Sequence, residues 1–449
     1  MNVRLLAVAC AFGFTSLVVP QTTVHRSFPA LLYTATPVYQ PLAWLQGGER
    51  FPQGATVFVK RGAAAKPLAP GFFATADANV AFDGKSVLFS GKQHAKDRWQ
   101  IWELTLSTGT LHQVTHCDDD CIKPFYVPAD SLVYAHKSSG RFVLEIAPLD
   151  GRGSALQLTH APGNFLPSDV LHDGRILFAS GYPLESSVVA ELYTVYPDGS
   201  GVEAYRCDHG RSRHSGRQVS SGDIVFARDG KLFRLTSALA HEVEVPAPHA
   251  DYAGDVAETP TGSWIVSTRS NQNHFELTTW KPDTAALLPL ISDPKMNIIE
   301  PVVLAARTVP NIFPSALHEW PYANVLCLNA YTSKEHIARG SIAAVRLFTR
   351  DALGQTQVQG TAQVEKDGSF YLRVPGDHAI RIELLDASGK PVKSEAGWYW
   401  LRSGEQRICV GCHAGPERAP ENAIPAVLQR STEPADFTQA VHASAAGGH

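Results

Sequence analysis

Residues 83–90 read Asp83-Gly-Lys-Ser-Val-Leu-Phe-Ser90, a polar turn that leads directly into a strand of β-branched and aromatic residues. Four similar segments follow, and successive starts lie 39 to 49 residues apart. They are Asp130-Ser-Leu-Val-Tyr-Ala135, Asp173-Gly-Arg-Ile-Leu-Phe-Ala-Ser180, Gly222-Asp-Ile-Val-Phe-Ala227 and Thr261-Gly-Ser-Trp-Ile-Val-Ser267. A period near 45 residues with short strands in each unit is the spacing of propeller blades. We therefore predict a mainly β protein with a β-propeller over residues 30–310.

The clearest repeats continue into a second strand and a tight turn. Examples are the strand Glu191-Leu-Tyr-Thr-Val195 and the turn Pro197-Asp198-Gly199 that follows it. Dipeptides of this kind close β-hairpins. Five units are visible, and Gly54-Ala-Thr-Val-Phe-Val59 with the stretch near Pro301 supplies a sixth. We expect six blades, with seven as the alternative.

A second domain is predicted after Pro310. Five segments rich in β-formers, separated by turns such as Asp367-Gly368, indicate a small antiparallel β-sandwich over residues 320–397. They are Val325-Leu-Cys-Leu-Asn-Ala330, Ile342-Ala-Ala-Val-Arg-Leu-Phe348, Gly360-Thr-Ala-Gln-Val364, Ser369-Phe-Tyr-Leu-Arg-Val374 and Ile380-Arg-Ile-Glu-Leu-Leu385. A short segment at 398–430 follows, with a helix over 421–429 capped by Asn422. The small, polar composition of residues 431–449 predicts a disordered tail.

The segment at 398–430 contains Cys409-Val410-Gly411-Cys412-His413, a C-x-x-C-H string. Two thiols at this spacing can each add to a vinyl group of one haem, and His413 is then the proximal iron ligand. A thioredoxin-like motif would need alternating strands and helices around it, and a zinc site would need a second Cys/His pair. The sequence therefore predicts one covalently attached haem c.

The distal iron ligand is left open by the sequence. Methionine is a common second ligand, and Met296 is the only methionine besides the start residue. Bis-histidine ligation is the alternative, and His318, His336 and His378 all lie in or beside the sandwich. Tyr331 is a further candidate, as an oxygen ligand or as a contact at the haem edge. An ordinary core or surface role is the alternative for each.

Cys117 and Cys121 bracket three aspartates, with His116 just before them. In an oxidising compartment a small-loop disulfide is the first expectation. A metal site built from His116, the aspartates and a thiol is the alternative. His116, His160 and His209 occupy equivalent blade ends, so repeat register accounts for them without a site.

Composition and the first residues indicate the compartment. Charged residues make up 18% and the net charge is −4, so there is no electrostatic reason to expect a nucleic-acid partner. Arg4 precedes an apolar run over residues 5–19 and a polar exit at 21–23. This pattern is typical of an export signal, here residues 1–22, and not of a membrane span. We expect a periplasmic or otherwise extracytoplasmic protein.

The repeats resemble TolB-type propellers, whose blades carry a D-G-[KR]-x-[IL]-x-F strand. The run of Trp398-Tyr-Trp400, the polar turn Arg402-Ser-Gly-Glu-Gln-Arg407, the C-x-x-C-H string and Ala419-Pro-Glu-Asn422 resembles the family of the hydrazine synthase alpha subunit. That resemblance implies an exported haem c protein with a propeller. In the synthase a tyrosine four residues beyond the motif histidine ligates the catalytic haem, while the histidine itself goes to zinc. Here Glu417 stands at the tyrosine position, and the synthase's further haem domain is not included in this sequence.

The sequence favours a mono-haem electron-transfer protein that meets a redox partner protein, with the propeller as docking scaffold. One haem motif and no other catalytic motif support this expectation. A haem enzyme or enzyme subunit acting on small nitrogen or oxygen species is the alternative that the resemblance implies. A propeller binding module with a structural haem is the third possibility.

Overall fold

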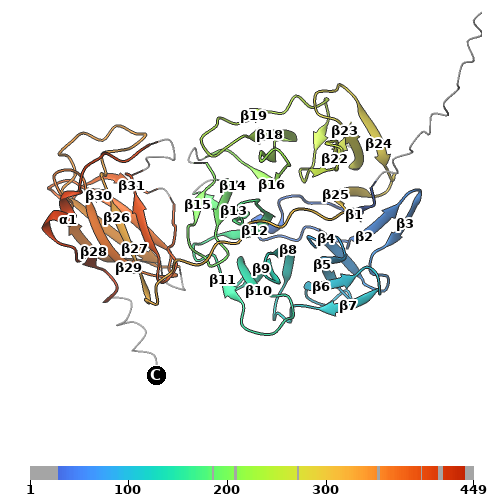
Figure 1. The fold of residues 1–449 in the computed structure, drawn as a ribbon, viewed down its shortest axis with the longest axis horizontal. Helices are drawn as coiled ribbons and strands as arrows, with labels where there is room; N and C mark the ends of the chain where they lie inside the picture. Colours follow the sequence, from blue (N-terminus) through green and yellow to red (C-terminus); the bar gives the residue numbers. More distant parts are fainter. Residues whose placement is uncertain are drawn as a thin grey trace, which may run out of the picture.

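The computed structural model describes residues 29–184, 187–206, 210–270, 273–350, 354–395, 397–412 and 418–439. These residues form a propeller and a smaller β-domain beside it (Figure 1). The predicted export signal at 1–22 and the predicted haem ligand His413 lie outside the described residues. Within them, no helix is long and apolar enough to cross a membrane.

The propeller is built from six antiparallel sheets around one axis (Figure 1). The strands of each sheet are given from the axis outward. The first sheet contains β25 (Asn297–Val303), β1 (Leu31–Thr36), β2 (Thr56–Arg61) and β3 (Ala64–Pro67), and the second contains β4 (Ala74–Val80), β5 (Ser86–Lys92), β6 (Gln100–Thr105) and β7 (Thr110–Gln113). The third sheet contains β8 (Cys121–Val127), β9 (Ser131–Ser138), β10 (Arg141–Pro148) and β11 (Leu156–Gln157). The fourth sheet contains β12 (Asn164–Val170), β13 (Ile176–Leu184), β14 (Ser187–Val195) and β15 (Glu203–Ala204), and the fifth contains β16 (His214–Gln218), β17 (Ile224–Arg228), β18 (Lys231–Leu235) and β19 (Val243–Glu244). The sixth sheet contains β20 (Asp251–Tyr252), β22 (Trp264–Arg269), β23 (Glu276–Trp280) and β24 (Leu287–Ile291), and β21 (Ala257–Glu258) also pairs with β22. Six sheets of this kind are what six blades require.

Each repeated segment of the sequence forms the second strand of a blade, namely β5, β9, β13, β17 and β22. The recurring phenylalanine explains the repeat, because Phe89, Phe178 and Phe226 are almost completely buried. The recurring threonine before the blade-end histidines is structural too. Thr115 Oγ1 accepts a hydrogen bond from the Ile101 N–H at 2.8 Å. In the next blade, Thr159 Oγ1 accepts a hydrogen bond from the Leu144 N–H at 2.9 Å. Repeat register therefore accounts for His116 and His160, while His209 lies outside the described residues.

The first blade joins the two ends of the propeller sequence. Strand β1 pairs with β2 on one side and with β25 on the other, and Leu31 lies opposite Val303 in that pairing. The stretch near Pro301 thus completes the blade begun at Gly54 to Val59, as predicted. This closure joins residues 272 positions apart, Leu31 and Val303, in one sheet.

The smaller domain consists of two packed sheets of four strands. One contains β32 (Gln406–Cys409), β26 (Tyr322–Cys327), β29 (Phe370–Pro375) and β33 (Ala435–Asp436), in that order. The other contains β28 (Thr356–Gln363), β27 (Ala344–Arg350), β30 (Ile380–Leu385) and β31 (Pro391–Ser394). Alternate residues of β27, β29 and β30 face inward and form one apolar core.

Three details differ from the prediction. The first sheet is mixed, because β32 and β33 come from the C-terminal segment and pair in parallel with β26 and β29. The helix is only α1 (Ala426–Arg430), and Asn422 does not cap it. Pro425 stands at the cap position, and the first free N–H groups donate to Asp367 and Ser369 on a neighbouring turn.

The predicted tail is also ordered at its start. Phe437 is buried in the core of the smaller domain, where its ring lies against Gly360. This buried aromatic side chain and the pairing of β33 with β29 together anchor residues 431–439 to the sheet. Residues 440–449 of the predicted tail lie outside the described residues.

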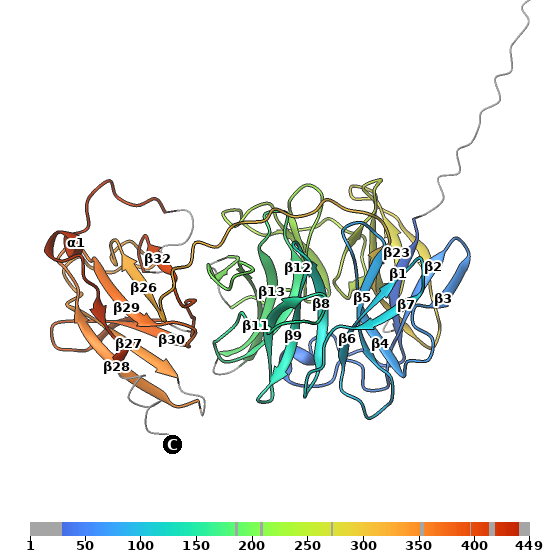
Figure 2. The ribbon, with the colours of Figure 1, turned by 60° about the horizontal axis from the view of Figure 1, so that its bottom comes forward.

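A linker over residues 304–321 connects the two domains and runs back across the propeller (Figure 2). It is held by main-chain hydrogen bonds from Arg307 to Phe82 and from Asn311 to His172. It ends where the smaller domain adjoins the third and fourth blades (Figure 1). The linker thereby carries the chain from the first blade to the opposite side of the ring.

Candidate functional site

The two motif thiols lie at the end of β32, on the edge of the smaller domain. Cys409 is its last residue, and Cys412 follows in a turn. Both thiols are free and partly buried, and both pack against the domain core, as Tyr331 and Tyr399 do. The structure therefore presents two unpaired thiols three residues apart, next to aromatic side chains.

The glycine between the thiols is required by a close backbone approach. A Cβ atom on Gly411 would lie 2.0 Å from the Thr332 carbonyl oxygen and 2.8 Å from that of Asn329. Such distances leave no room for a side chain. The turn that carries the thiols is thus seated directly on the loop after β26, a contact that the motif itself did not reveal.

Burial keeps both thiols in the neutral form. It raises the pKa of Cys412, and the neighbouring carboxylate of Glu395 raises it further. Burial also raises the pKa of Cys409, although the guanidinium of Arg407 opposes this shift. Neutral, buried thiols react slowly, because the thiolate is the nucleophile. Attachment to an electrophile is therefore expected to need an opening of this segment.

The side chains before the motif alternate between two environments. Tyr399 faces the thiols, and burial is the main cause that raises its pKa. Trp400 faces the other way and enters the propeller core, where it is 3% exposed. Its Nε1–H donates to the Leu158 carbonyl at 3.0 Å, and its ring packs edge-on against Phe165. Of the three aromatic residues from Trp398 to Trp400, Tyr399 is the one beside the thiols.

Polar contacts fasten the same segment to the propeller. The Arg407 guanidinium donates to the Val202 carbonyl at 3.1 Å and to Glu405, which in turn accepts from the Gly201 N–H. Arg402 pairs with Asp377, whose other oxygen lies 3.5 Å from His160 Nε2. The strand that ends in Cys409 is therefore held between the two domains.

The predicted distal ligands fall in different places. Met296 packs with Leu31 and Ile298 near the first blade, across the propeller from the smaller domain (Figure 1). His318 stacks on Trp320 beside Gly404, before the start of β32. The His378 Nδ1–H donates to the Gly376 carbonyl, near the domain interface.

His336 and Tyr331 lie closer to the motif. His336 is exposed on the loop that begins with Thr332, the residue in contact with Gly411. The same loop reaches the thiol region through the ion pair of Glu335 with Lys393. The structure thus brings the His336 loop and Tyr331 to the thiols, and leaves the other three candidates away from them.

Cys117 and Cys121 are joined in a disulfide, where the sequence led us to expect one. His136 lies beside this disulfide, and its Nδ1 is 2.9 Å from Glu145. His116 is exposed. With both sulfurs bonded to each other, these residues do not form the alternative metal site.

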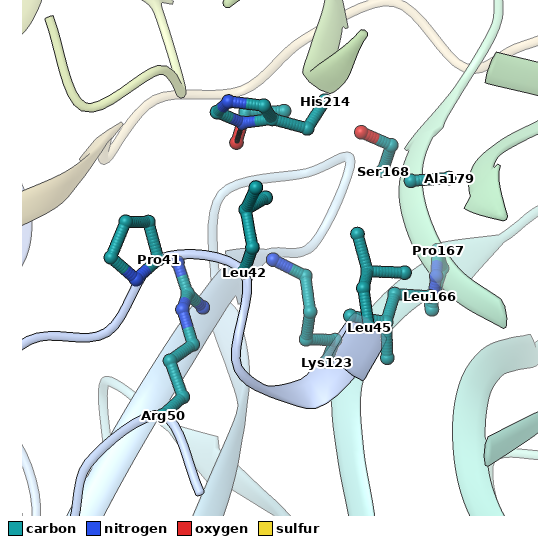
Figure 3. Close-up of a pocket in the computed structure, with 11 residues that line it drawn as sticks. Pro41, Leu42, Leu45, Arg50, Lys123, Leu166, Pro167, Ser168, Ala179 and His214 are labelled. Atoms are coloured by element: carbon teal, nitrogen blue, oxygen red, sulfur yellow. Dashed lines mark hydrogen bonds between the residues drawn. The ribbon is translucent and has the colours of Figure 1, made fainter. Parts of the chain in front are cut away.

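A second polar cluster, which the sequence did not indicate, fills the propeller axis. Arg50 enters it from the loop after β1, and its guanidinium is 3.0 Å from Asp77 and in contact with Glu300. Lys123 and Asp255 complete the cluster. Figure 3 shows Arg50, Lys123 and His214 around the side chain of Leu42. The cavity between them is only about 30 Å³, room for about one water molecule and not for a substrate.

His214 gives this cluster a pH dependence. Burial lowers its pKa to about 4, below the ordinary value of 6.5. The folded protein therefore binds fewer protons than the unfolded chain between these two values, so stability is complete above pH 6.5 and falls as the pH drops towards 4. We expect the free energy of unfolding to lose up to about 1.4 kcal/mol per pH unit from this residue.

A His214→Gln variant tests this expectation. Urea unfolding followed by circular dichroism should show a smaller loss of stability between pH 7 and pH 5 than in the wild type. The exposed His112 on β7 provides the control, since His112→Gln should leave the loss unchanged. An unaltered pH dependence in His214→Gln would show that this histidine is not the source.

The donor chemistry of the thiol site fits a covalently attached haem. Cys409 and Cys412 are free, unbonded to each other and set on a turn that only glycine permits. Tyr399 offers apolar ring surface next to them, and Tyr331 packs on the same core. Fold and site together define a class: an all-β protein in which a closed propeller holds a β-domain with a paired-thiol turn.

Both the sequence and the fold of this chain are similar to those of known proteins. Residues 326–414 match the family described as the hydrazine synthase alpha subunit middle domain. Hydrazine synthase subunit alpha of Kuenenia stuttgartiensis is 36% identical over 67 residues, which are 15% of this chain and 8% of that relative. The solved hydrazine synthase from the same organism matches with a TM-score of 0.78 at 18% identity, over 89% of this chain and 71% of that one.

A weaker likeness is to TolB from Acinetobacter baumannii, with a TM-score of 0.46 at 17% identity, over 61% of this chain and 66% of that one. The matched residues include the paired-thiol turn, and most of the chain shares its fold with the solved hydrazine synthase, so this chain is similar to the hydrazine synthase alpha subunit. This confirms the resemblance that the sequence indicated.

Proposed function

We propose that this protein is an exported haem c protein that acts as an enzyme or enzyme subunit on small nitrogen species. The likeness to hydrazine synthase alpha favours this function over the simple electron-transfer role that the sequence suggested first. The observation that carries the proposal is the pair of free thiols, Cys409 and Cys412, inside the domain that matches the synthase family.

The roles of the individual residues follow from their positions. Cys409 and Cys412 would form the two thioether bonds, and His413 would be the axial ligand of the motif. Tyr331 and Tyr399 would exclude water from one side of the site, because both pack on the domain core. When bound, haem supplies an iron that can bind a small nitrogen species and exchange electrons with it.

Glu395 is an acidic side chain beside the thiols, with Oε1 3.8 Å from Cys412 Sγ. It is partly buried, and its carboxylate could hold or pass a proton close to the reacting centre. The described residues contain a single C-x-x-C pair, so a reaction that consumes electrons would need a separate redox partner protein. This is the partner that the sequence predicted.

Optical spectroscopy distinguishes an enzyme from an electron carrier. The full chain, exported from a host that matures c-type haem, should show the ferrous bands of one covalent haem. Those bands should shift when CO or NO is added, because an enzyme keeps a position open at the iron. A six-coordinate, low-spin iron that ignores both gases would leave electron transfer as the better function.

A Cys412→Ala variant should lose stably bound haem and keep a folded propeller. Removing one thiol removes one of the two thioether bonds, whereas no blade depends on this turn. The measurement is haem retained after extraction in acid and organic solvent, together with circular dichroism of the β-sheet. The control is Cys117→Ala with Cys121→Ala, which should retain haem. Loss of the whole fold in Cys412→Ala would contradict the independence of the propeller.

A further inference from the structure

A third thiol lies next to the motif. Cys327 ends β26, the strand that pairs in parallel with β32, and it stands directly opposite Cys409 in that pairing. The Leu328 N–H, one residue on, donates to the Cys409 carbonyl at 2.9 Å, so the two strands are still hydrogen-bonded at this point. Cys327 and Cys409 are therefore immediate neighbours although 82 residues separate them.

Both side chains also face the same way. Directly opposed residues in adjacent strands project on the same side of a sheet. Cys327 is 2% exposed in the core of the smaller domain, and Cys409 packs against that same core. Neighbouring strands lie about 4.8 Å apart, within the range of Cα separations that a disulfide bridges.

We propose that Cys327 forms a disulfide with Cys409 in the haem-free protein, and that this bond reversibly blocks haem attachment. Cys409 is the more exposed thiol of the two, so it is the one that an incoming disulfide reaches first. The consequence for haem rests on the proposed function, whereas formation of the disulfide does not.

The chemistry balances with a low-molecular-weight disulfide such as oxidised glutathione as the oxidant. The Cys409 thiolate attacks one glutathione sulfur, forms a mixed disulfide and releases one glutathione thiolate, which takes up the proton lost by Cys409. The Cys327 thiolate then attacks the Cys409 sulfur and releases the second glutathione. Two protein thiols are oxidised to one disulfide, and one glutathione disulfide is reduced to two thiols.

The block follows from the attachment chemistry. A thioether to haem needs the Cys409 sulfur as a free thiol. While this sulfur is bonded to Cys327, only Cys412 can react. A reductant that opens the disulfide would restore both thiols, so the extent of haem attachment would depend on the redox poise of the compartment.

Disulfide mapping tests the proposal without any haem. The full chain is produced haem-free, equilibrated with reduced and oxidised glutathione, alkylated, digested and analysed by mass spectrometry. We expect a peptide pair that links residues 327 and 409, both in the wild type and in Cys412→Ser. A bond between 409 and 412 in the wild type, or no bond to 327 in Cys412→Ser, overturns the proposal. The disulfide of Cys117 with Cys121 serves as an internal control.

The effect on haem attachment is a second, separate measurement. In a maturing host, withholding thiol reductant should lower haem attachment to the wild type several-fold and leave attachment to Cys327→Ala unchanged. Equal losses in the two proteins would contradict the block. If no haem attaches to either protein while the 327–409 bond forms, the proposed function fails and the disulfide stands. Cys327→Ser offers a second replacement if alanine destabilises the core.

Discussion

Replacing Arg50 with methionine should lower the free energy of unfolding of the propeller by about 3 to 5 kcal/mol, because buried carboxylates would lose their main partner. The guanidinium is 3.0 Å from Asp77, 3.9 Å from Asp255 and in contact with Glu300. These acids come from three different blades, and the Arg50 side chain is only 4% exposed. One cation thus joins three blades at the axis.

The loss of unfolding free energy caused by Arg50→Met should be larger at high pH than at low pH. Burial and the charge of Glu300 raise the pKa of Asp77 to about 7. Burial acts to raise the pKa of Glu300 as well, but Arg50 and Lys123 outweigh it and lower that pKa. Without Arg50, both carboxyls should bind protons more readily in the folded state. The stability deficit is therefore largest above pH 7 and shrinks as the pH falls towards 5.

Urea unfolding at pH 8 and pH 5.5, followed by circular dichroism, measures both effects. Arg61→Met, an exposed arginine on β2, is the matched control and should change stability by less than about 0.5 kcal/mol. Adding Glu300→Gln to Arg50→Met should recover part of the loss, since it removes one uncompensated charge. An Arg50→Met protein as stable as the wild type at pH 8 would show that the cluster does not hold the ring.

Replacing Trp400 with alanine should cost about 3 to 5 kcal/mol and separate the two domains. This side chain leaves the smaller domain to fill a space in the propeller core, between Phe165 and His160. It also donates a buried hydrogen bond to Leu158. Its removal leaves both a cavity and an unpaired carbonyl at the contact between domains.

Domain separation can be followed by limited proteolysis of the linker at residues 304–321 and by small-angle scattering. The variant should be cleaved faster and should be more extended than the wild type, while circular dichroism stays that of a β protein. Phe348→Ala is the control, because Phe348 lies on β27 within the smaller domain, is only partly buried and packs under Arg381. A compact, protease-resistant Trp400→Ala protein would contradict the role of this anchor.

The repeated strands were predictable from sequence because their pattern is local. A turn followed by a strand with a buried aromatic residue is visible within eight residues, and all five segments proved to be the second strand of a blade. The closure through β25 could also be anticipated, since one blade lacked strands. A helix was predicted at 421–429 and is present, but its start was placed too early, because the start depends on Asp367 and Ser369, which are distant in sequence.

The candidate site was predictable only in part. The spacing of Cys409 and Cys412 is a local signal. The position of Cys327 beside Cys409 depends on the parallel pairing of β26 with β32, which no short sequence motif predicts. The polar cluster around Arg50 at the propeller axis could not be predicted from the sequence for a similar reason. Asp77, Lys123 and Glu300 lie on inner strands at bulges, and Asp255 lies between β20 and β21. All four adopt positive φ, and no short sequence pattern indicates a bulge.

The closure of the first blade has a consequence for the order of synthesis. Strand β1 ends at Thr36, but its neighbour β25 begins at Asn297, so a growing chain must extend by about 260 residues before the ring can shut. Until then the early blade exposes an unpaired strand edge, which is a site for aggregation. The linker and the thiol-bearing domain are made only afterwards. The smaller domain is thus synthesised after all strands of the propeller, against which it packs, have been made.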